Sequence, residues 1–419
     1  MPFDSQSPVL PRTSLARTPL LYLLPSQPDR DAGSAGLLAA EIAGLRSLGR
    51  PILPFLLGPQ GYGADAELLA EARRVAAAAA ESPLKRAFTR PLGLARAARL
   101  AMRQTSMPAG KAMALGARVA AAALRHGCTG IHATTSDAGA TAALIGGRLA
   151  GLQVSLATGA GDAPDLPLQL GAADLVLAPS RETASALSDL APLARIHVVP
   201  QGLDAQWFRP GSGMSRNGRL LCLAPLVPQS GLAALIGALA RMPPAARPVI
   251  DVIGAGPLLE TLRATALEAG VSDHLRFLGA RGRDWVAAEG ARYLGLVAPG
   301  LPGEAAGVPI AVLQAMALEL PVLASALPGL REVLPAEAGH LVSPGDEMAL
   351  ARGLHWLMTM PEEQRRRFGT AGRARVLHGL TVGDRAASLA RLLPRGEARA
   401  ISDRMDSFDR NSCSRNNKL

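Results

Sequence analysis

The chain has 419 residues, of which 48% are hydrophobic and 19% charged, and its formal net charge is +10. This length suits two domains of roughly 180–200 residues, and the composition excludes fibrous and wholly disordered classes. Aromatic residues make up only 3%, which favours helices packed on a sheet over an all-β sandwich. The three cysteines are far apart in the sequence, so neither a disulfide framework nor a zinc site is expected.

No targeting segment is recognisable in the sequence. The apolar stretch at 19–25 is too short for the core of a signal peptide. No run approaches the roughly 18 apolar residues that a membrane-spanning helix needs. We therefore expect a cytoplasmic protein.

The N-terminal half, residues 17–209, is predicted to alternate strands and helices after a tail at 1–16. Leu38, Ile42 and Leu45 have the three-and-four spacing of an amphipathic helix, which lies between two apolar strands. Strand, helix and strand joined by short connections imply a parallel sheet. Strands are predicted at 20–24, 52–57, 130–133, 154–157, 174–178 and 196–199, with Ala-rich helices between 66 and 126 and a further helix at 137–150.

A basic segment occupies residues 84–125, where nine lysines and arginines occur without any acidic residue. Such a segment can face the phosphates of an anionic membrane or of nucleic acid, or it can be an ordinary solvated helix face. Because aromatic residues are not interleaved with these cations and no recognition motif is present, we expect no nucleic-acid binding. The residues predicted to form an anion-facing or membrane-facing surface are Lys85, Arg86, Arg90, Arg96, Arg99 and Arg103.

A linker rich in Gly, Ser and Pro at 210–218 separates this half from a second one. The second half, residues 219–380, repeats the alternation, and the polar residues 395–419 are predicted to be a disordered tail. Two facing halves of this kind bind ligands outside the carboxyl ends of their strands. Strands are predicted at 219–224, 248–253, 274–278, 293–298, 321–325 and 339–342, and helices at 231–241, 257–269, 284–290, 309–319 and 346–359.

Four sequence stretches of the second half occur in the order and spacing of a known family. They are VVPQGLD (198–204) with FRP (208–210), VIGAGPL (252–258) with LRFLG (275–279), GVPIAVLQAMA (307–317) with LPVLAS (320–325), and GHLVSPGD (339–346). Together they resemble family 4 retaining glycosyltransferases of the GT-B type, particularly exopolysaccharide and colanic-acid-type enzymes. The resemblance implies an α/β GT-B fold, with two Rossmann-like parallel-sheet domains facing across a cleft. It also implies that a last helix at 381–394 returns to the first domain.

The same resemblance implies hexosyl transfer from a nucleotide-diphosphate sugar to a lipid-linked or polysaccharide acceptor, in exopolysaccharide or cell-envelope glycan biosynthesis. No metal ion and no other cofactor is implied. The donor is expected at turns and helix N-termini, where backbone N–H groups can face phosphate. The residues expected to contact it are Gly254, Gly256, Pro257, Gly307, Val308, Pro309 and Gln314.

Several donor-site residues of the family are replaced in this sequence. The Arg and Lys that hold the donor diphosphate correspond to Pro225 and Ser230, so both cations are missing. The two glutamates of the family correspond to Ala306 and Gln314, and its first-domain histidine corresponds to Gly159. The sequence therefore departs from the family where charge is required.

Other residues are candidates to take over these roles. Arg281 and Arg283 are expected to contact phosphate, and Glu304 and His132 are the candidate catalytic residues. Two hypotheses remain open. The first is an active transferase docked on the inner face of the membrane. The second is an inactive pseudo-glycosyltransferase that acts as a partner or regulator of an active transferase.

Overall fold

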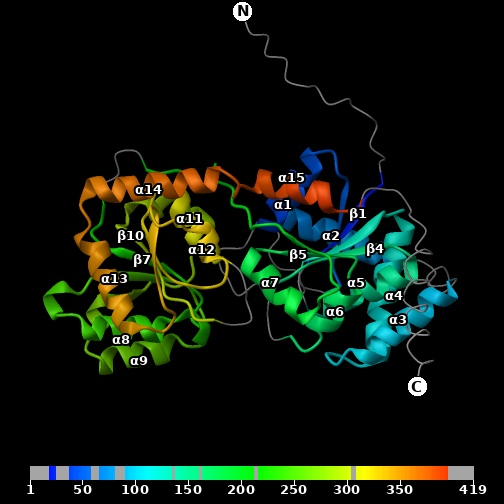
Figure 1. Ribbon diagram of the computed structural model, residues 1–419, viewed down its shortest axis with the longest axis horizontal. Helices are drawn as coiled ribbons and strands as arrows, with labels where there is room; N and C mark the ends of the chain where they lie inside the picture. Colours follow the sequence, from blue (N-terminus) through cyan, green and yellow to red (C-terminus); the bar gives the residue numbers. More distant parts are fainter. Residues whose placement is uncertain are drawn as a thin grey trace, which may run out of the picture.

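The computed structural model describes residues 18–24, 37–57, 66–80, 90–134, 137–159, 163–211, 216–302 and 308–394. These residues form two α/β domains that lie side by side (Figure 1). Each domain has its own six-stranded parallel sheet, and no strand pairing joins the two sheets within the described residues. The prediction of two Rossmann-like halves is confirmed, whereas both predicted tails lie outside the described residues.

The N-terminal sheet has the strand order β2-β1-β3-β4-β5-β6. Its strands β1, β3 and β5 are buried along their whole length, because helices cover both faces of a parallel sheet. The strands are β1 (Leu20–Leu23), β2 (Ile52–Phe55), β3 (Gly130–Ala133), β4 (Gln153–Ala157), β5 (Leu175–Ala178) and β6 (Ile196–Val198). The helices are α1 (Leu37–Ser47), α2 (Ala66–Ala80), α3 (Pro91–Arg103), α4 (Ala109–Arg125), α5 (Ala138–Ala150), α6 (Leu166–Ala172) and α7 (Arg181–Leu190).

Prolines mark two helix starts in the Ala-rich region. Pro91 is the first residue of α3, and Pro108 is the N-cap of α4, because a proline fits a first helical turn that needs no intrahelical N–H donor. Small residues let α4 and α5 pack closely. A Cβ added to Gly146 would lie 2.8 Å from the Val119 Cβ. Several alanines of α4 are also buried, so the alanine content reflects close helix packing.

The C-terminal sheet has the order β12-β11-β10-β7-β8-β9. Strand addition reverses direction between β7 and β10, which makes this the topological switch point of a Rossmann-like domain. The strands are β7 (Leu220–Leu223), β8 (Ile250–Ile253), β9 (Leu275–Phe277), β10 (Gly295–Ala298), β11 (Val322–Ser325) and β12 (Gly339–Val342).

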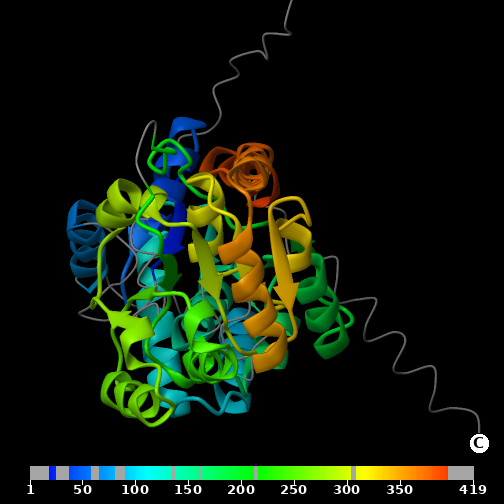
Figure 2. The ribbon, with the colours of Figure 1, turned by 90° about the vertical axis from the view of Figure 1, so that its left-hand side faces the viewer.

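Helices cover both faces of this sheet (Figure 2). The helices are α8 (Leu232–Arg241), α9 (Leu259–Glu268), α10 (Arg283–Glu289), α11 (Ile310–Ala317), α12 (Leu330–Val333), α13 (Glu347–Thr359) and α14 (Glu362–Leu377), with short 3-10 turns at Pro228–Ser230, Pro244–Ala246, Ser272–His274 and Gly290–Arg292. Helix α14 was not predicted from the sequence.

The last helix, α15 (Val382–Leu392), follows α14 but lies in the N-terminal domain against α1 (Figure 1). Its Ala386 and Leu389 belong to the same buried cluster as Leu20 and Leu45. The core of the N-terminal domain is therefore completed by residues more than 300 positions later in the chain.

A buried polar network fixes α15 in this place. Tyr22 of β1 donates a hydrogen bond to the carboxylate of Glu41, and Arg385 of α15 pairs with the same carboxylate. Arg385 also donates to the carbonyls of Val199 and Pro200, each at 3.1 Å. Burial raises the pKa of Glu41, but the charge of Arg385 and both hydrogen bonds lower it by more. Glu41 is therefore held as a carboxylate.

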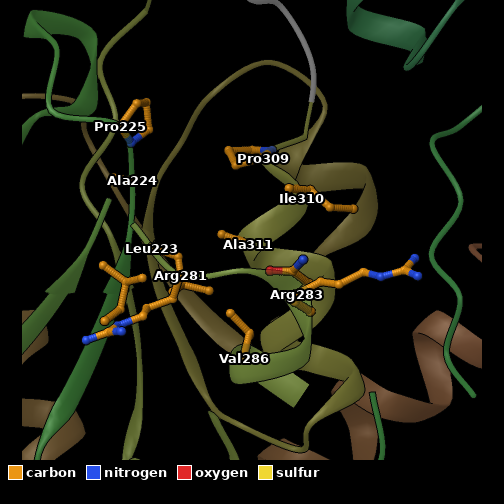
Figure 3. A pocket seen from close by; sticks show the side chains of 11 residues that line it. Leu223, Ala224, Pro225, Arg281, Arg283, Val286, Pro309, Ile310 and Ala311 are labelled. Carbon is orange, nitrogen blue, oxygen red and sulfur yellow. The ribbon is translucent and has the colours of Figure 1, made fainter. Parts of the chain in front are cut away.

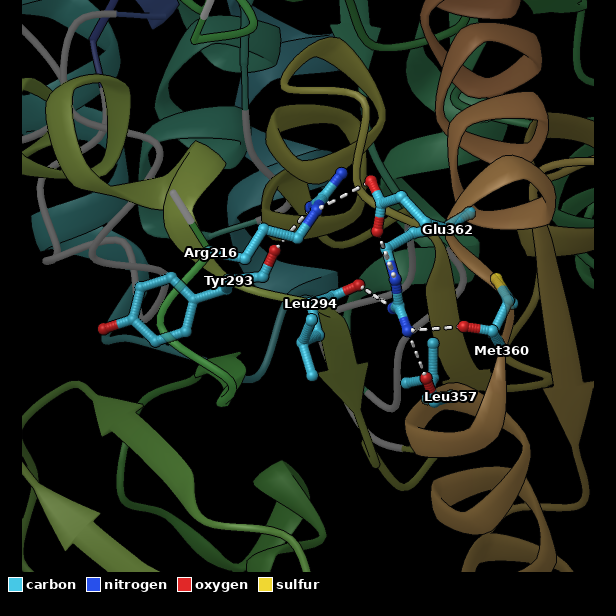
Figure 4. Close-up of polar contacts among 7 residues, drawn as sticks. Arg216, Tyr293, Leu294, Leu357, Met360 and Glu362 are labelled. Carbon is cyan, nitrogen blue, oxygen red and sulfur yellow. Dashed lines mark hydrogen bonds and ion pairs between the residues drawn. The ribbon is translucent and has the colours of Figure 1, made fainter. Parts of the chain in front are cut away.

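A second network fastens the linker to the C-terminal domain (Figure 4). The buried Arg365 of α14 donates to the carbonyls of Leu357 and Met360 at 2.9 and 3.2 Å, which satisfies the end of α13. Glu362 pairs with Arg365 at 3.6 Å and with Arg216 of the linker at 3.3 Å. The interdomain segment is thus anchored from residue 216 onward.

Candidate functional site

A pocket that is open to solvent lies at the carboxyl edge of the C-terminal sheet (Figure 3). It is bounded by the ends of β7 and β8, by the segment that leads into α10, and by the start of α11. This is the switch point of the sheet, where open α/β folds bind ligands. The lining residues are Leu223, Ala224, Pro225, Ile253, Arg281, Arg283, Val286, Pro309, Ile310, Ala311 and Gln314.

The N-terminus of α11 provides one wall of the pocket. Pro309 is its N-cap, and Ile310 and Ala311 form its first turn. The first N–H groups of a helix have no intrahelical partner and carry the positive end of its dipole. An anionic group in the pocket would therefore face favourable backbone charge.

Arg281 and Arg283 supply the positive side chains of the described lining. The two side chains extend in opposite directions (Figure 3). The guanidinium of Arg283 lies 4.3 Å from the ring centroid of Trp207, a cation–π distance. Arg281 is exposed, and no partner for it is recorded among the described residues. Arg281 is thus the cation that is better placed to meet a ligand phosphate.

The two positions that lack the family's cations differ in their geometry. Pro225 lines the pocket directly. Ser230 is buried, and its hydroxyl donates to the Val227 carbonyl at 2.7 Å inside its own turn. A cation placed at Pro225 would therefore reach the pocket without rearrangement of the chain, whereas one at Ser230 would have to leave this turn.

The glycines after β8 serve a packing role. Added Cβ atoms at Gly254 and Gly256 would overlap the carbonyl oxygens of Ala224 and Leu226, so these glycines let the chain after β7 pass over them. The Gly254 amide donates to the Gly279 carbonyl at 3.1 Å. It is therefore not free for a ligand phosphate, contrary to our expectation.

Some of the other residues that were predicted to bind the donor line the pocket, and others do not. Pro309 and the buried Gln314 line the pocket. Val308 is buried directly before Pro309 and is not among the lining residues, and contact between the donor and Gly256 or Pro257 stays a prediction. Glu304 and Gly307 lie outside the described residues, as does Ala306.

His132 does not lie at the cleft, so the prediction of a catalytic role for it is wrong. It is fully buried in the middle of β3, in register with Tyr22 of β1 and Ser155 of β4. Its Nδ1 lies 2.8 Å from the Ser155 hydroxyl, and burial lowers the pKa of His132 to about 4. A neutral side chain without solvent access is a core residue that cannot touch a substrate.

The basic surface combines cations with exposed apolar groups on α3. Leu92 and Met102 are 73% and 71% exposed, Arg99 and Arg103 are exposed, and Arg96 is half-buried. Leu92, Arg96, Arg99 and Arg103 have the three-and-four spacing of one helix face. Arg90 donates to the Ala150 carbonyl at 3.3 Å. Lys85 and Arg86 lie outside the described residues.

The described part of the chain contains no group of three or more His, Cys, Asp or Glu side chains that could hold a metal ion. It also contains no helix that is both long and apolar enough to cross a membrane.

Comparison with known proteins points to one family. Residues 212–375 match the family model "Glycosyl transferases group 1". Over 248 residues the chain is 32% identical to a GDP-mannose-dependent alpha-(1-6)-phosphatidylinositol monomannoside mannosyltransferase of Mycolicibacterium smegmatis. This alignment covers 54% of the chain and 64% of the relative, so the chain spans less than two thirds of that protein.

Solved structures establish the fold. Anabaena HepE in complex with UDP-glucose has a TM-score of 0.66 and 18% identity, and covers 90% of this chain and 99% of its own. Sucrose-phosphate synthase of Thermosynechococcus elongatus has a TM-score of 0.65 and 19% identity, with coverage of 90% and 98%. The chain therefore has the GT-B fold, as the sequence predicted.

Proposed function

We propose that the chain binds a nucleotide-diphosphate hexose in the pocket of the C-terminal domain and transfers the hexose to a lipid-linked or polysaccharide acceptor of glycan biosynthesis. The pocket itself carries this proposal, because it joins the N-terminus of α11 to Arg281 at the switch point of the sheet. Both features favour a diphosphate. The reaction would need no metal ion and no other cofactor, since the N-terminus of α11 and Arg281 would stabilise the negative charge of the departing diphosphate.

The relatives suggest which donor to test first. The mycobacterial relative is named for GDP-mannose and for a phosphatidylinositol mannoside acceptor, and the Anabaena structure contains UDP-glucose. GDP-mannose is therefore the first donor to offer this chain, with UDP-glucose as its comparison.

Arg281→Gln is expected to weaken donor binding by a factor of about 10 to 100, because a hydrogen bond to a charged group contributes about 1.5–3 kcal/mol. Titration calorimetry with GDP-mannose measures the change. Arg263→Gln is the matched control, because Arg263 is exposed, is paired with Glu260 on α9 and is not among the residues that line the pocket. Equal affinities for the wild type and Arg281→Gln would contradict the proposed role of Arg281.

A non-catalytic role is the second candidate. No described residue that lines the pocket carries a carboxylate, and Pro225 stands where the family has a cation. A protein of this kind would bind the donor and assist an active transferase without turnover. The release of free GDP, measured with and without a lipid acceptor, separates the two candidates. Donor binding without release would favour the partner or regulator.

We also propose that α3 docks the protein on an anionic membrane surface at the inner face of the cell membrane. The exposed Leu92 and Met102 can enter the interface while the neighbouring arginines meet lipid phosphates. Docking of this kind would keep the protein on the surface that holds a lipid-linked acceptor.

The variant Arg99→Gln with Arg103→Gln is expected to bind anionic vesicles roughly 30-fold more weakly, since each cation near the surface contributes about 1 kcal/mol. Co-sedimentation with phosphatidylglycerol vesicles measures this, and pure phosphatidylcholine vesicles should retain little of either protein. Arg73→Gln with Arg74→Gln removes the same charge from exposed positions of α2 and should bind like the wild type. An equal loss in both variants would show that only net charge matters.

A further inference from the structure

The two domains touch through a reciprocal pair of carboxylates. The N-terminus of α7, in the N-terminal domain, faces α12 of the C-terminal domain at the centre of the molecule (Figure 1). Glu332 of α12 accepts the backbone N–H groups of Arg181 and Glu182, both at 3.1 Å. Glu182 in turn accepts the backbone N–H of Gly329 at 3.0 Å. Each domain thus places a carboxylate on the other domain's backbone.

This contact suits a closure that can open again. Glu332 meets the positive end of α7, where a carboxylate is favoured. Both Glu182 and Glu332 are exposed, so water can replace the three hydrogen bonds when the domains separate. The contact therefore stabilises a closed arrangement without making it permanent.

Gly329 connects the contact to the pocket. Its φ is +81°, a backbone conformation that favours glycine. A Cβ at this position would lie 2.8 Å from the Ser180 Cβ and 3.6 Å from the Val308 Cγ2. Gly329 therefore lies between the N-terminal domain and the residue that precedes Pro309, the N-cap of α11.

The two segments that cross between the domains run together. Leu203 and Thr381 form a parallel bridge. The Leu203 amide donates to the Leu380 carbonyl at 2.8 Å, and the Val382 amide donates to the Leu203 carbonyl at 3.1 Å. The two crossings therefore lie at one place, beside Gly379, whose φ is +101°. A rotation of one domain about this place would change the distance between α7 and α12.

We propose that Glu182 and Glu332 form a clasp that holds the two domains closed and positions Val308 at the start of α11. The clasp goes beyond the proposed function, because it is a property of the chain whatever ligand the pocket takes. Its release would separate α7 from α12. Ser180 would then move away from Val308, the residue before the N-cap of α11.

The test measures the distance between the domains without a ligand. Nitroxide labels are placed by Ser188→Cys on α7 and Met348→Cys on α13, both exposed positions. Cys413 is replaced by serine, while Cys128 and Cys222 are buried and are left in place. In this background, Glu182→Ala with Glu332→Ala is expected to move at least half of the molecules to longer distances in pulsed electron resonance.

Glu337→Ala is the matched control, because it removes an exposed carboxylate from the same domain and should keep the distance distribution of the wild type. Each single substitution in the clasp should give an intermediate distribution. Melting curves establish that the variants are folded. A folded double variant with the wild-type distribution would overturn the clasp, and this result would leave donor binding untouched, so the two proposals fail separately.

Discussion

Arg385→Met is expected to lower the free energy of unfolding by about 3–5 kcal/mol, because removing one partner of a buried ion pair leaves the other charge uncompensated. Arg385 pairs with the buried Glu41 and also bonds two backbone carbonyls of the crossing segment. Its loss would leave the Glu41 carboxylate with Tyr22 as a neutral donor. Urea unfolding at pH 7, followed by far-UV circular dichroism, measures the change.

The double variant Glu41→Gln with Arg385→Met is the control for this prediction. Removing both charges leaves no buried ion, so this variant should be more stable than Arg385→Met alone. A double variant as unstable as the single one would show that packing, not charge, fixes α15.

The effect of Arg385→Met on the free energy of unfolding is expected to depend on pH. In the wild type the pKa of Glu41 is lowered from its ordinary 4.5. Its contribution to the free energy of unfolding is therefore complete above pH 4.5, and it is lost as the pH falls through the lowered pKa. Without Arg385, burial should raise this pKa, and protonation then relieves the buried charge. The difference between the wild type and Arg385→Met should therefore shrink as the pH falls below the raised value.

Pro225→Arg with Ser230→Lys is expected to raise nucleotide-sugar affinity by a factor on the order of 100 or more. Each restored charge-assisted contact contributes about 1.5–3 kcal/mol. Pro225 already lines the pocket, so most of the gain should come from the arginine. Gln229→Lys adds the same charge as Ser230→Lys at an exposed position outside the lining and should add little. Calorimetry with GDP-mannose and UDP-glucose compares the variants.

Restoring the carboxylates extends this test to turnover. Adding Ala306→Glu and Gln314→Glu is expected to raise donor hydrolysis or transfer, because the described lining of the pocket carries no carboxylate and these substitutions supply two. Suppose that the two cation substitutions leave the melting temperature unchanged and yet no nucleotide sugar binds. The pocket would then be unable to hold a nucleotide sugar, and the protein would be an interaction scaffold rather than a transferase.

The sequence predicted the sheets because parallel strands buried on both faces are short apolar runs, as β1 and β5 show. It did not predict α14, whose sequence EEQRRRFGTAGRARVL has few apolar residues. This helix is stabilised by tertiary contacts, such as those of Arg365, and not by an amphipathic pattern.

The ordered motifs predicted where the pocket would be, and Arg281, Pro309 and Gln314 line it. They did not predict the contact between Arg283 and Trp207, nor the clasp between Glu182 and Glu332. Such pairs join residues far apart in sequence, and no spacing rule predicts them. His132 was misassigned because a histidine after apolar residues has the same pattern in a core as at an active site.

The return of α15 has a consequence for synthesis on the ribosome. The strands and α1 of the N-terminal domain are made before the C-terminal domain, yet Ala386 and Leu389, which pack into their core, are made after it. Until then this domain exposes apolar surface that a nascent chain has no means of covering. The core of the C-terminal domain extends to Val376 and Leu380, so all of its residues are made before Ala386 and Leu389. The domain that is translated first is therefore the one that is completed last.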